Sequence, residues 1–243
     1  MLIAVCATLS FIGLLLSMPE TVAPHQRAVN LGQISRDYGK VFCNRRFLAS
    51  ALCIPLLALP LMGWIALSPV MLIQQAGMSV MAYGLWQIPV FASLIAGNLL
   101  LVKFTDRWPL GHSVSVGRVP LLAGVTLIFA GSLLSSVPHY FLIAGMCFIS
   151  LGEGLSFAVL YRFALTASDV AKGAVAASMT MLSLVVYTLG VELLKKAFMF
   201  AGYAGFALLA LVFALVFRQL SRRMVGEAMA ERAQGGRLAE ECA

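Results

Sequence analysis

The sequence predicts an all-α integral membrane protein with seven transmembrane helices, of which the last six form one bundle. Three observations support this fold class. Hydrophobic residues make up 61% of the 243 residues and charged residues only 11%, whereas about a quarter of a soluble domain is charged. The apolar residues gather in seven runs. The lysines and arginines lie between these runs and favour alternate connections, as they do in multi-pass membrane proteins.

The apolar runs have lengths suited to helices that cross a lipid bilayer. A crossing helix needs about 20 mostly apolar residues. Because backbone polar groups in lipid must be bonded within their own segment, helices are favoured over isolated strands. The first run covers residues 2–17. The other six cover residues 47–73, 83–102, 119–134, 140–161, 174–194 and 203–217.

These runs divide the chain into four parts. Residues 1–18 are interpreted as the end of a truncated leading transmembrane helix. A signal peptide is the weaker interpretation, because no basic segment precedes the run. Residues 19–46 are predicted to be a cytoplasmic loop, in which 31–41 could form a short interfacial helix. Residues 47–217 are predicted to form the six-helix bundle, and residues 218–243 a polar cytoplasmic tail.

The basic residues predict the orientation of the chain. Fifteen of the 17 lysines and arginines lie before the second run, after the third and fifth runs, or in the tail, and only Lys195 and Lys196 lie on the other side. Cytoplasmic loops of membrane proteins are enriched in Lys and Arg. We therefore expect a multi-pass protein of the bacterial inner membrane, with its N-terminus in the periplasm and its C-terminus in the cytoplasm.

Composition also argues against several other classes of protein. The net charge of +7 does not indicate a nucleic-acid partner, because the basic residues are separated by apolar runs and do not cover one face of a soluble domain. The five cysteines are scattered without a Cys-x-x-Cys pair. The sequence shows no nucleophile–base pair, metal cluster or phosphate loop, so we expect neither an enzyme nor a cofactor.

Six helices that follow a long basic loop resemble the C-terminal half of a major facilitator superfamily transporter, which is built from two six-helix bundles. Short motifs narrow the resemblance to drug/proton antiporters of the MdfA type, over residues 1 to about 200. The motifs are Met18-Pro19-Glu20-Thr21, Leu59-Pro60-Leu61-Met62-Gly63-Trp64-Ile65 with Ser68-Pro69, Tyr83-Gly84-Leu85 with Gln87, Pro89 and Phe91, the run Leu94-Ile95-Ala96-Gly97-Asn98-Leu99-Leu100-Leu101, and Ala167-Ser168-Asp169 with Lys172-Gly173.

This resemblance implies part of a multidrug efflux transporter that exports lipophilic cationic or neutral compounds and uses a proton gradient as its energy source. Its partners would be the lipid bilayer, small lipophilic drugs and an N-terminal half that this chain lacks. The family's principal acidic residues lie in its first helix, and a functional arginine lies in its fourth. We therefore expect the chain alone to confer no drug resistance. The competing hypothesis is a truncated, non-transporting fragment, or a half-transporter that needs a partner half.

Glu153 is the leading candidate for proton coupling. It lies between Gly152 and Gly154 inside the run 140–161, with no basic residue within a helical turn. A carboxylate at this depth costs about 2.5–3.5 kcal/mol on insertion scales, so it must be neutral, paired or in contact with water. We expect Glu153 to face the central cavity of the assembled transporter in a mostly protonated form. The alternative is a structural glutamate that is bonded within the bundle.

Four further residues are candidates for coupling or gating at the cytoplasmic face. Asp106 and Arg107 follow the third run and resemble a degenerate copy of the superfamily's Gly-x-x-x-Asp-Arg loop. An Asp at such a junction can accept bonds from helix N-termini and pair with Arg. An ordinary polar turn is an equally good interpretation. Arg162 and Lys172 bracket the next cytoplasmic loop and are either membrane anchors or, as the resemblance favours, gating residues.

Candidate drug-binding residues lie on the second and third runs. Leu61, Met62 and Ile65 are spaced i, i+1 and i+4 and are expected to share a helix face. The resemblance matches them to positions that line the drug pocket of the family. Gln87 is a further polar candidate. For each of these residues, packing between helices is an equally good explanation.

The sixth run carries a second group of candidates. Thr180, Ser183 and Tyr187 are spaced i, i+3 and i+7, which places three polar groups on one side of a helix in lipid. A cavity is the natural explanation for such a polar face. The resemblance matches Thr180 and Leu184 to positions of the family's pocket. Helix packing again remains the alternative.

Overall fold

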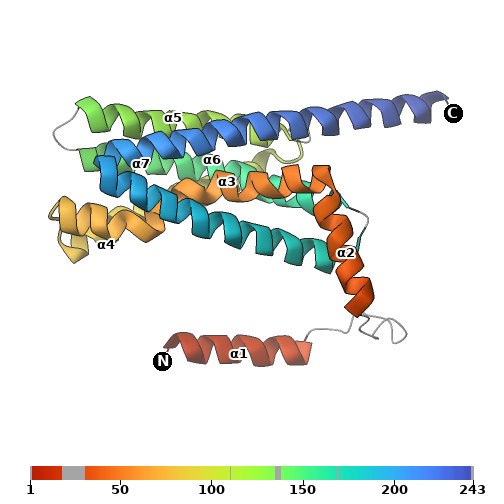
Figure 1. Ribbon diagram of the computed structural model, residues 1–243, viewed down its shortest axis with the longest axis horizontal. Coiled ribbons are helices and arrows are strands. Elements are labelled where there is room, and N and C mark those ends of the chain that lie inside the picture. Colours follow the sequence, from red (N-terminus) through yellow and green to blue (C-terminus); the bar gives the residue numbers. More distant parts are fainter. Residues whose placement is uncertain (1, 18–30, 110, 135–137, 169, 242–243) are drawn as a thin grey trace. The chain divides into compact units, whose positions relative to one another are not determined.

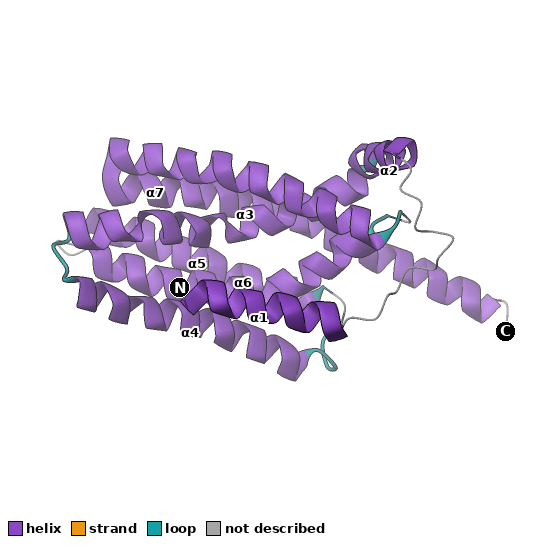
Figure 2. Cartoon of the chain, turned by 90° about the horizontal axis from the view of Figure 1, so that it is seen from below, coloured by secondary structure: helices purple, strands orange, loops and turns teal. Residues whose placement is uncertain are grey.

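The computed structural model describes residues 2–17, 31–109, 111–134, 138–168 and 170–241. Within these ranges the chain is built from helices joined by short connections, and Figure 2 shows no strand there. The prediction of an all-α membrane protein is confirmed. By its internal contacts the chain divides into two units, Met1–Arg36 and Asp37–Ala243. The first unit contains helix α1 (Leu2–Ser17), which is apolar but shorter than the later spans.

Five described helical segments are long and apolar enough to cross a membrane. They are formed by α3 (Arg45–Ser68) with its π-helical continuation η2 (Pro69–Gln75), α4 (Val80–Phe104), α5 (His112–Leu134), α6 (Pro138–Thr166) and α7 (Lys172–Glu241). Helix α2 (Leu31–Cys43) precedes them. A short helix was expected at 31–41, and its position at the membrane interface stays a prediction.

Helix α7 supplies two of the six expected spans of the bundle. Its backbone leaves the helical region at Ala201 and at Gly202, where φ is +59° and ψ is −143°. This positive φ is readily adopted by glycine because it has no Cβ. The chain reverses direction within α7, and its two arms diverge from the reversal (Figure 1). The first arm corresponds to the predicted run 174–194, and the second to the run 203–217.

Local sequence explains where α3 begins and why its end is irregular. Asn44 has an extended backbone, and its side chain accepts hydrogen bonds from the backbone N–H groups of Arg46 and Phe47, which caps the helix. The Asn44 side-chain amide also donates to the carbonyl of Ala167 at 2.9 Å, which joins this cap to the end of α6. At the other end, Pro69 lacks the N–H that an α-helical turn would use, and the chain continues as π-helix.

Helix α6 is the centre of the bundle. It packs most extensively against α5, then against α4 and α3, and least against α7. Helix α3 packs against α7. Close contacts between α5 and α6 occur where glycines face backbone. A Cβ added at Gly124 would meet the Gly145 carbonyl, and one added at Gly117 would lie 2.7 Å from the Gly152 carbonyl. Such small-residue contacts are the usual way in which membrane helices approach each other closely.

Candidate functional site

Glu153 lies where α6 is enclosed by its neighbours. A Cβ added at Gly152 would lie 2.5 Å from the Gly117 carbonyl of α5, and one added at Gly154 would lie 3.0 Å from the Cα of Gly97 in α4. Successive residues of a helix are rotated by about 100°. The two glycines therefore direct α6 toward α5 and α4, and the Glu153 side chain points between these two directions.

The Glu153 side chain is enclosed within the bundle. Its exposed fraction is 5%, and its Oε2 atom is buried without a hydrogen-bond partner. Tyr187 of α7 lies close enough to interact with it electrostatically. The expectation that Glu153 faces the central cavity of the assembled two-half transporter stays a prediction, because this chain spans about half of such a protein. The residue is buried within the bundle between the two glycine contacts of α6 with α5 and α4. Its part in proton coupling stays a prediction.

Two buried hydroxyls lie on α6 near Glu153. Ser150 is three residues before it and Ser156 three residues after it, and both are fully buried. Neither hydroxyl has a hydrogen-bond partner. Ser156 packs against Gly117 of α5. Three polar side chains of one helix thus lie inside the bundle with unused hydrogen-bonding capacity, which is rare in a protein interior.

Gln87 belongs to a network of hydrogen bonds between α3 and α4. Its Oε1 atom accepts from the Trp64 indole N–H at 2.8 Å, and its Nε2 atom donates to the Ser68 hydroxyl at 3.2 Å. The Ser68 and Tyr83 hydroxyls lie 3.2 Å apart and share a further bond. The network fixes the Gln87 side chain at the contact of the two helices.

The apolar candidates of α3 do not share one environment. Leu61 is buried with an exposed fraction of 2%, Met62 is half-buried, and Ile65 is 48% exposed. Leu61 therefore belongs to the hydrophobic core of the bundle. Only Met62 and Ile65 reach its surface.

The candidates on the first arm of α7 lie together at the surface of the bundle. Thr180 is exposed and its hydroxyl donates to the Ala176 carbonyl, while Ser183 and Tyr187 are half-buried and Leu184 is 61% exposed. Polar and apolar groups alternate along this arm, from an exposed threonine to a half-buried tyrosine beside Glu153. Their part in drug binding stays a prediction.

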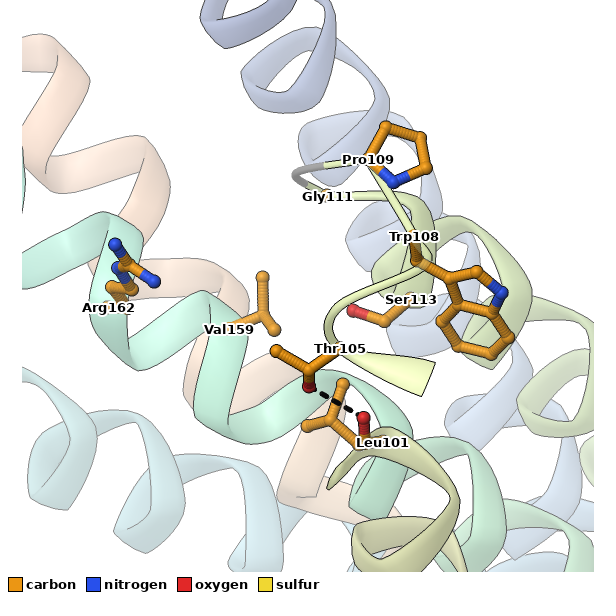
Figure 3. A pocket seen from close by; sticks show the side chains of 8 residues that line it. All are labelled: Leu101, Thr105, Trp108, Pro109, Gly111, Ser113, Val159 and Arg162. Carbon is orange, nitrogen blue, oxygen red and sulfur yellow. Dashed lines mark hydrogen bonds between the residues drawn. The ribbon is translucent and has the colours of Figure 1, made fainter. Parts of the chain in front are cut away.

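A pocket of about 220 Å³ lies at the end of the bundle where α4 connects to α5 (Figure 3). Arg162 contributes from α6, and Thr105 donates its hydroxyl to the Leu101 carbonyl at 2.6 Å. Trp108 stacks on Phe104 with ring centroids 5.0 Å apart. The residues that line the pocket are Leu101, Thr105, Trp108, Pro109, Gly111, Ser113, Val159 and Arg162.

The remaining gating candidates flank this end of the bundle. Asp106 and Arg107 are both exposed in the turn after α4. Lys172 donates from Nζ to the carbonyls of Leu165 at 2.9 Å and Ser168 at 3.2 Å, so it satisfies carbonyl groups at the end of α6. The structure thus places Arg162 in the pocket, Lys172 on the next connection, and Asp106 and Arg107 at the surface.

Sequence reasoning missed two features. Arg118 was counted only as a cytoplasmic basic residue, although it is buried in α5 with an exposed fraction of 9%. Its position directly before the predicted apolar run 119–134 was the available signal. The glycine contacts of α5 and α6 were also missed. Spacings of seven residues, from Gly117 to Gly124 and from Gly145 to Gly152, could have indicated a shared helix face.

Comparison with known proteins supports the resemblance seen in the motifs. The chain is 37% identical over 234 residues to the multidrug transporter MdfA of Edwardsiella ictaluri, a match that covers 96% of this chain and 57% of that protein. It is 38% identical over 216 residues to MdfA of Yersinia pestis, a match that covers 89% of this chain and 53% of that protein. It is also 38% identical over 219 residues to MdfA of Shigella boydii, which covers 90% of this chain and 53% of that protein. No protein-family model matches the chain.

The chain spans about half the length of the curated relatives it matches. Over that half it is a homologue of MdfA multidrug transporters. The expected resemblance to the C-terminal half of MdfA-type transporters is thereby confirmed. Together with the long apolar helices, this identifies the chain as a multi-pass membrane protein.

Proposed function

We propose that this chain forms one six-helix half of a multidrug efflux transporter, which exports lipophilic cationic or neutral compounds across the bacterial inner membrane. The observation that carries the proposal is the 37% identity to a multidrug transporter along 96% of the chain. The basic residues support an orientation with the N-terminus in the periplasm and the C-terminus in the cytoplasm. Residues 47–217 would be the transporting bundle of this half.

The first arm of α7 would supply one wall of the drug-binding cavity. A multidrug site needs adaptable apolar surface with a few polar groups. The exposed Thr180 and Leu184 and the half-buried Ser183 and Tyr187 provide this combination. Met62 and Ile65 on α3 would add a second apolar surface, with Gln87 holding α3 and α4 together behind it.

Glu153 would carry the proton in this half. A buried carboxyl with no counter-ion is costly when charged, so the enclosed state seen here suits its neutral form. A state in which water reaches the same carboxyl would allow it to ionise. Alternation between the two environments would exchange one proton in each cycle. Tyr187 would join this step to the proposed drug-binding wall, since it lies within electrostatic range of Glu153 on the arm that also carries Thr180.

Asp106, Arg107, Arg162 and Lys172 would act in gating at the cytoplasmic end. Arg162 lines the pocket there, and an N-terminal half could dock against that end when the cavity closes. Lys172 would hold the connection between α6 and α7 in place.

Expression of a hybrid transporter tests the proposed function. The chain would be joined to the N-terminal half of MdfA from Edwardsiella ictaluri and produced in a strain that lacks drug pumps. We expect the hybrid to restore efflux of a cationic dye, and the 243-residue chain alone to give none. Efflux by the chain alone, or a hybrid that inserts in the membrane without any efflux, would contradict the proposal.

The role of Glu153 is tested in the same hybrid with Glu153→Gln, which keeps the shape and removes the titratable group. We expect export of a cationic drug to fall more than export of a neutral one, and drug-induced proton release to disappear. The matched control is Glu192→Gln, because Glu192 is an exposed acid of α7 that pairs with Lys195 at 3.5 Å. Equal export of both drug classes by the Glu153 variant would make Glu153 a structural residue.

A further inference from the structure

Arg118 is a buried cation that the proposed transport mechanism does not use. It lies in α5, six residues or about 9 Å from the first residue of the helix, His112. Its exposed fraction is 9%. One hydrogen bond is formed by its guanidinium, from Nη2 to the Ser115 hydroxyl at 3.1 Å, while the Nε atom is buried without a partner. A buried charge normally has an ionic partner, because its desolvation is otherwise uncompensated.

The charged groups around Arg118 have the same sign. Helix α5 packs against α7, and Gly111 directly before α5 faces Val225, so the second arm of α7 lies beside the first turns of α5. Arg218 and Arg222 of this arm are thereby within electrostatic range of Arg118, as is the Cys53 thiol from α3. Arg218 and Arg222 are four residues apart and therefore share one helix face. Arg218 is half-buried and Arg222 is exposed, so the three arginines lead from the interior of the bundle to its surface.

No carboxylate balances these charges within the part of the chain whose side chains the structure describes. The one ion pair among these described side chains joins Lys195 to Glu192. The electrostatic neighbours of Arg118 include no acid. Three guanidinium groups on packed helices, with no acid among them, repel one another. Their arrangement is stabilised when an anion binds between them, and phosphate oxygens match the fork of N–H donors that each guanidinium presents.

We propose that Arg118, Arg218 and Arg222 form a binding site for a phosphate group, supplied by the headgroup of an anionic phospholipid. Basic pockets between transmembrane helices are suited to such headgroups. Arg118 lies about 9 Å from the first residue of α5, and Arg218 directly follows the apolar run 203–217, so the site lies where the headgroup region of the bilayer is expected to begin. The buried Arg118 would hold the phosphate at its inner side, and the exposed Arg222 would hold it at its outer side. A bound lipid would thereby join α5 to the second arm of α7.

Lipid binding to the detergent-purified chain tests the site. The probes are phosphatidylglycerol, the neutral lipid phosphatidylcholine, and inorganic phosphate as a competitor, with bound lipid counted by native mass spectrometry. The main variant is Arg222→Gln, because its exposed side chain can be changed without disturbing the fold. Arg118→Gln is a second variant, and retained helicity is checked for both. The matched control is Arg223→Gln, the next residue of the same helix and not an electrostatic neighbour of Arg118.

We expect one phosphatidylglycerol to bind in preference to phosphatidylcholine, and Arg222→Gln to weaken it about fivefold, as for one basic residue at an anionic headgroup. Arg223→Gln should change the affinity less than twofold. Resistance of the bound lipid to inorganic phosphate would support a lipid headgroup as the natural ligand. Displacement by millimolar phosphate would assign the same site to a soluble phosphate. Equal effects of the Arg222 and Arg223 variants, or equal retention of both lipids, would overturn the proposal.

Discussion

Gly154→Ala should loosen the contact that places Glu153 inside the bundle. The added Cβ would lie 2.9 Å from the backbone nitrogen of Asn98 and 3.0 Å from the Cα of Gly97, and closer still to the Leu94 carbonyl. Nonbonded carbon atoms prefer about 3.5–4.0 Å. Because these contacts are to the backbone of α4, no flexible side chain can move aside. The two helices must therefore separate by roughly 0.5–1 Å.

The free-energy cost of this separation can be taken from small-to-large substitutions in other protein cores. Extra methyl or methylene groups in a well-packed interior cost about 1–3 kcal/mol. Since 1.4 kcal/mol is a factor of ten in an equilibrium constant, the unfolding equilibrium should shift by about 5- to 150-fold. The substitution adds no charge and keeps good helix propensity, so the loss reports packing between α4 and α6.

An unfolding titration of the purified chain in SDS, followed by tryptophan fluorescence, measures the effect. Gly84→Ala is the matched control, because Gly84 lies in the same helix as Gly97 and a Cβ there would meet no atom within 4 Å. We expect the control to be neutral or slightly more stable than the unchanged chain. A Gly154→Ala chain as stable as the Gly84→Ala control would refute the close approach of α4 and α6.

Three further predictions follow from the helix cap, the polar network and the charge distribution. Asn44→Ala should destabilise the chain by about 1–2 kcal/mol and speed hydrogen exchange in the first turn of α3, since the cap and the bond to Ala167 are both lost; unchanged exchange there would contradict the capping role. Gln87→Leu should cost about 1–3 kcal/mol in the SDS titration by leaving the Trp64 N–H unpaired, whereas the exposed Gln74→Leu should cost little; equal losses would speak against the network. A reporter fused to the C-terminus should be active in the cytoplasm only, and periplasmic activity would reverse the proposed topology.

Hydropathy sufficed to predict the fold because lipid leaves few alternatives. A long apolar run that cannot be solvated must form a helix, and each predicted run from 47 to 217 has a helical counterpart. Helix ends were predicted less well. The run 119–134 stands within α5, which begins seven residues earlier at His112. A polar residue such as Arg118 ends an apolar run in the sequence. The helix nevertheless continues through it, because neighbouring helices enclose its side chain.

The environment of the candidate residues was harder to predict than their helices. Spacing places residues on a helix face, but it does not say which neighbour covers that face. Leu61 and Ile65 were expected on one surface, yet Leu61 is in the core and Ile65 is 48% exposed. Gln87 was a candidate for drug contact, and the spacing gave no sign that its amide bonds two side chains of α3. Such outcomes depend on tertiary contacts that a single helix pattern does not contain.

The packing around α6 indicates how water could reach Glu153 in the proposed cycle. Gly152 places the backbone of α6 against that of α5, and Gly154 places it against that of α4. Separation of α6 from either helix would therefore break a close backbone contact. The contact of α6 with α7 is its least extensive helix interface, and Tyr187 lies on that side. Separation of the first arm of α7 from α6 would therefore leave the close contacts of α6 with α5 and α4 intact, although this arm also packs against α3, where Gly190 faces Leu59 and Gly63 faces Leu194. The same movement would shift Thr180 and Leu184, so opening at Glu153 would reshape the proposed drug-binding wall. Proton exchange and drug release would then share one moving element.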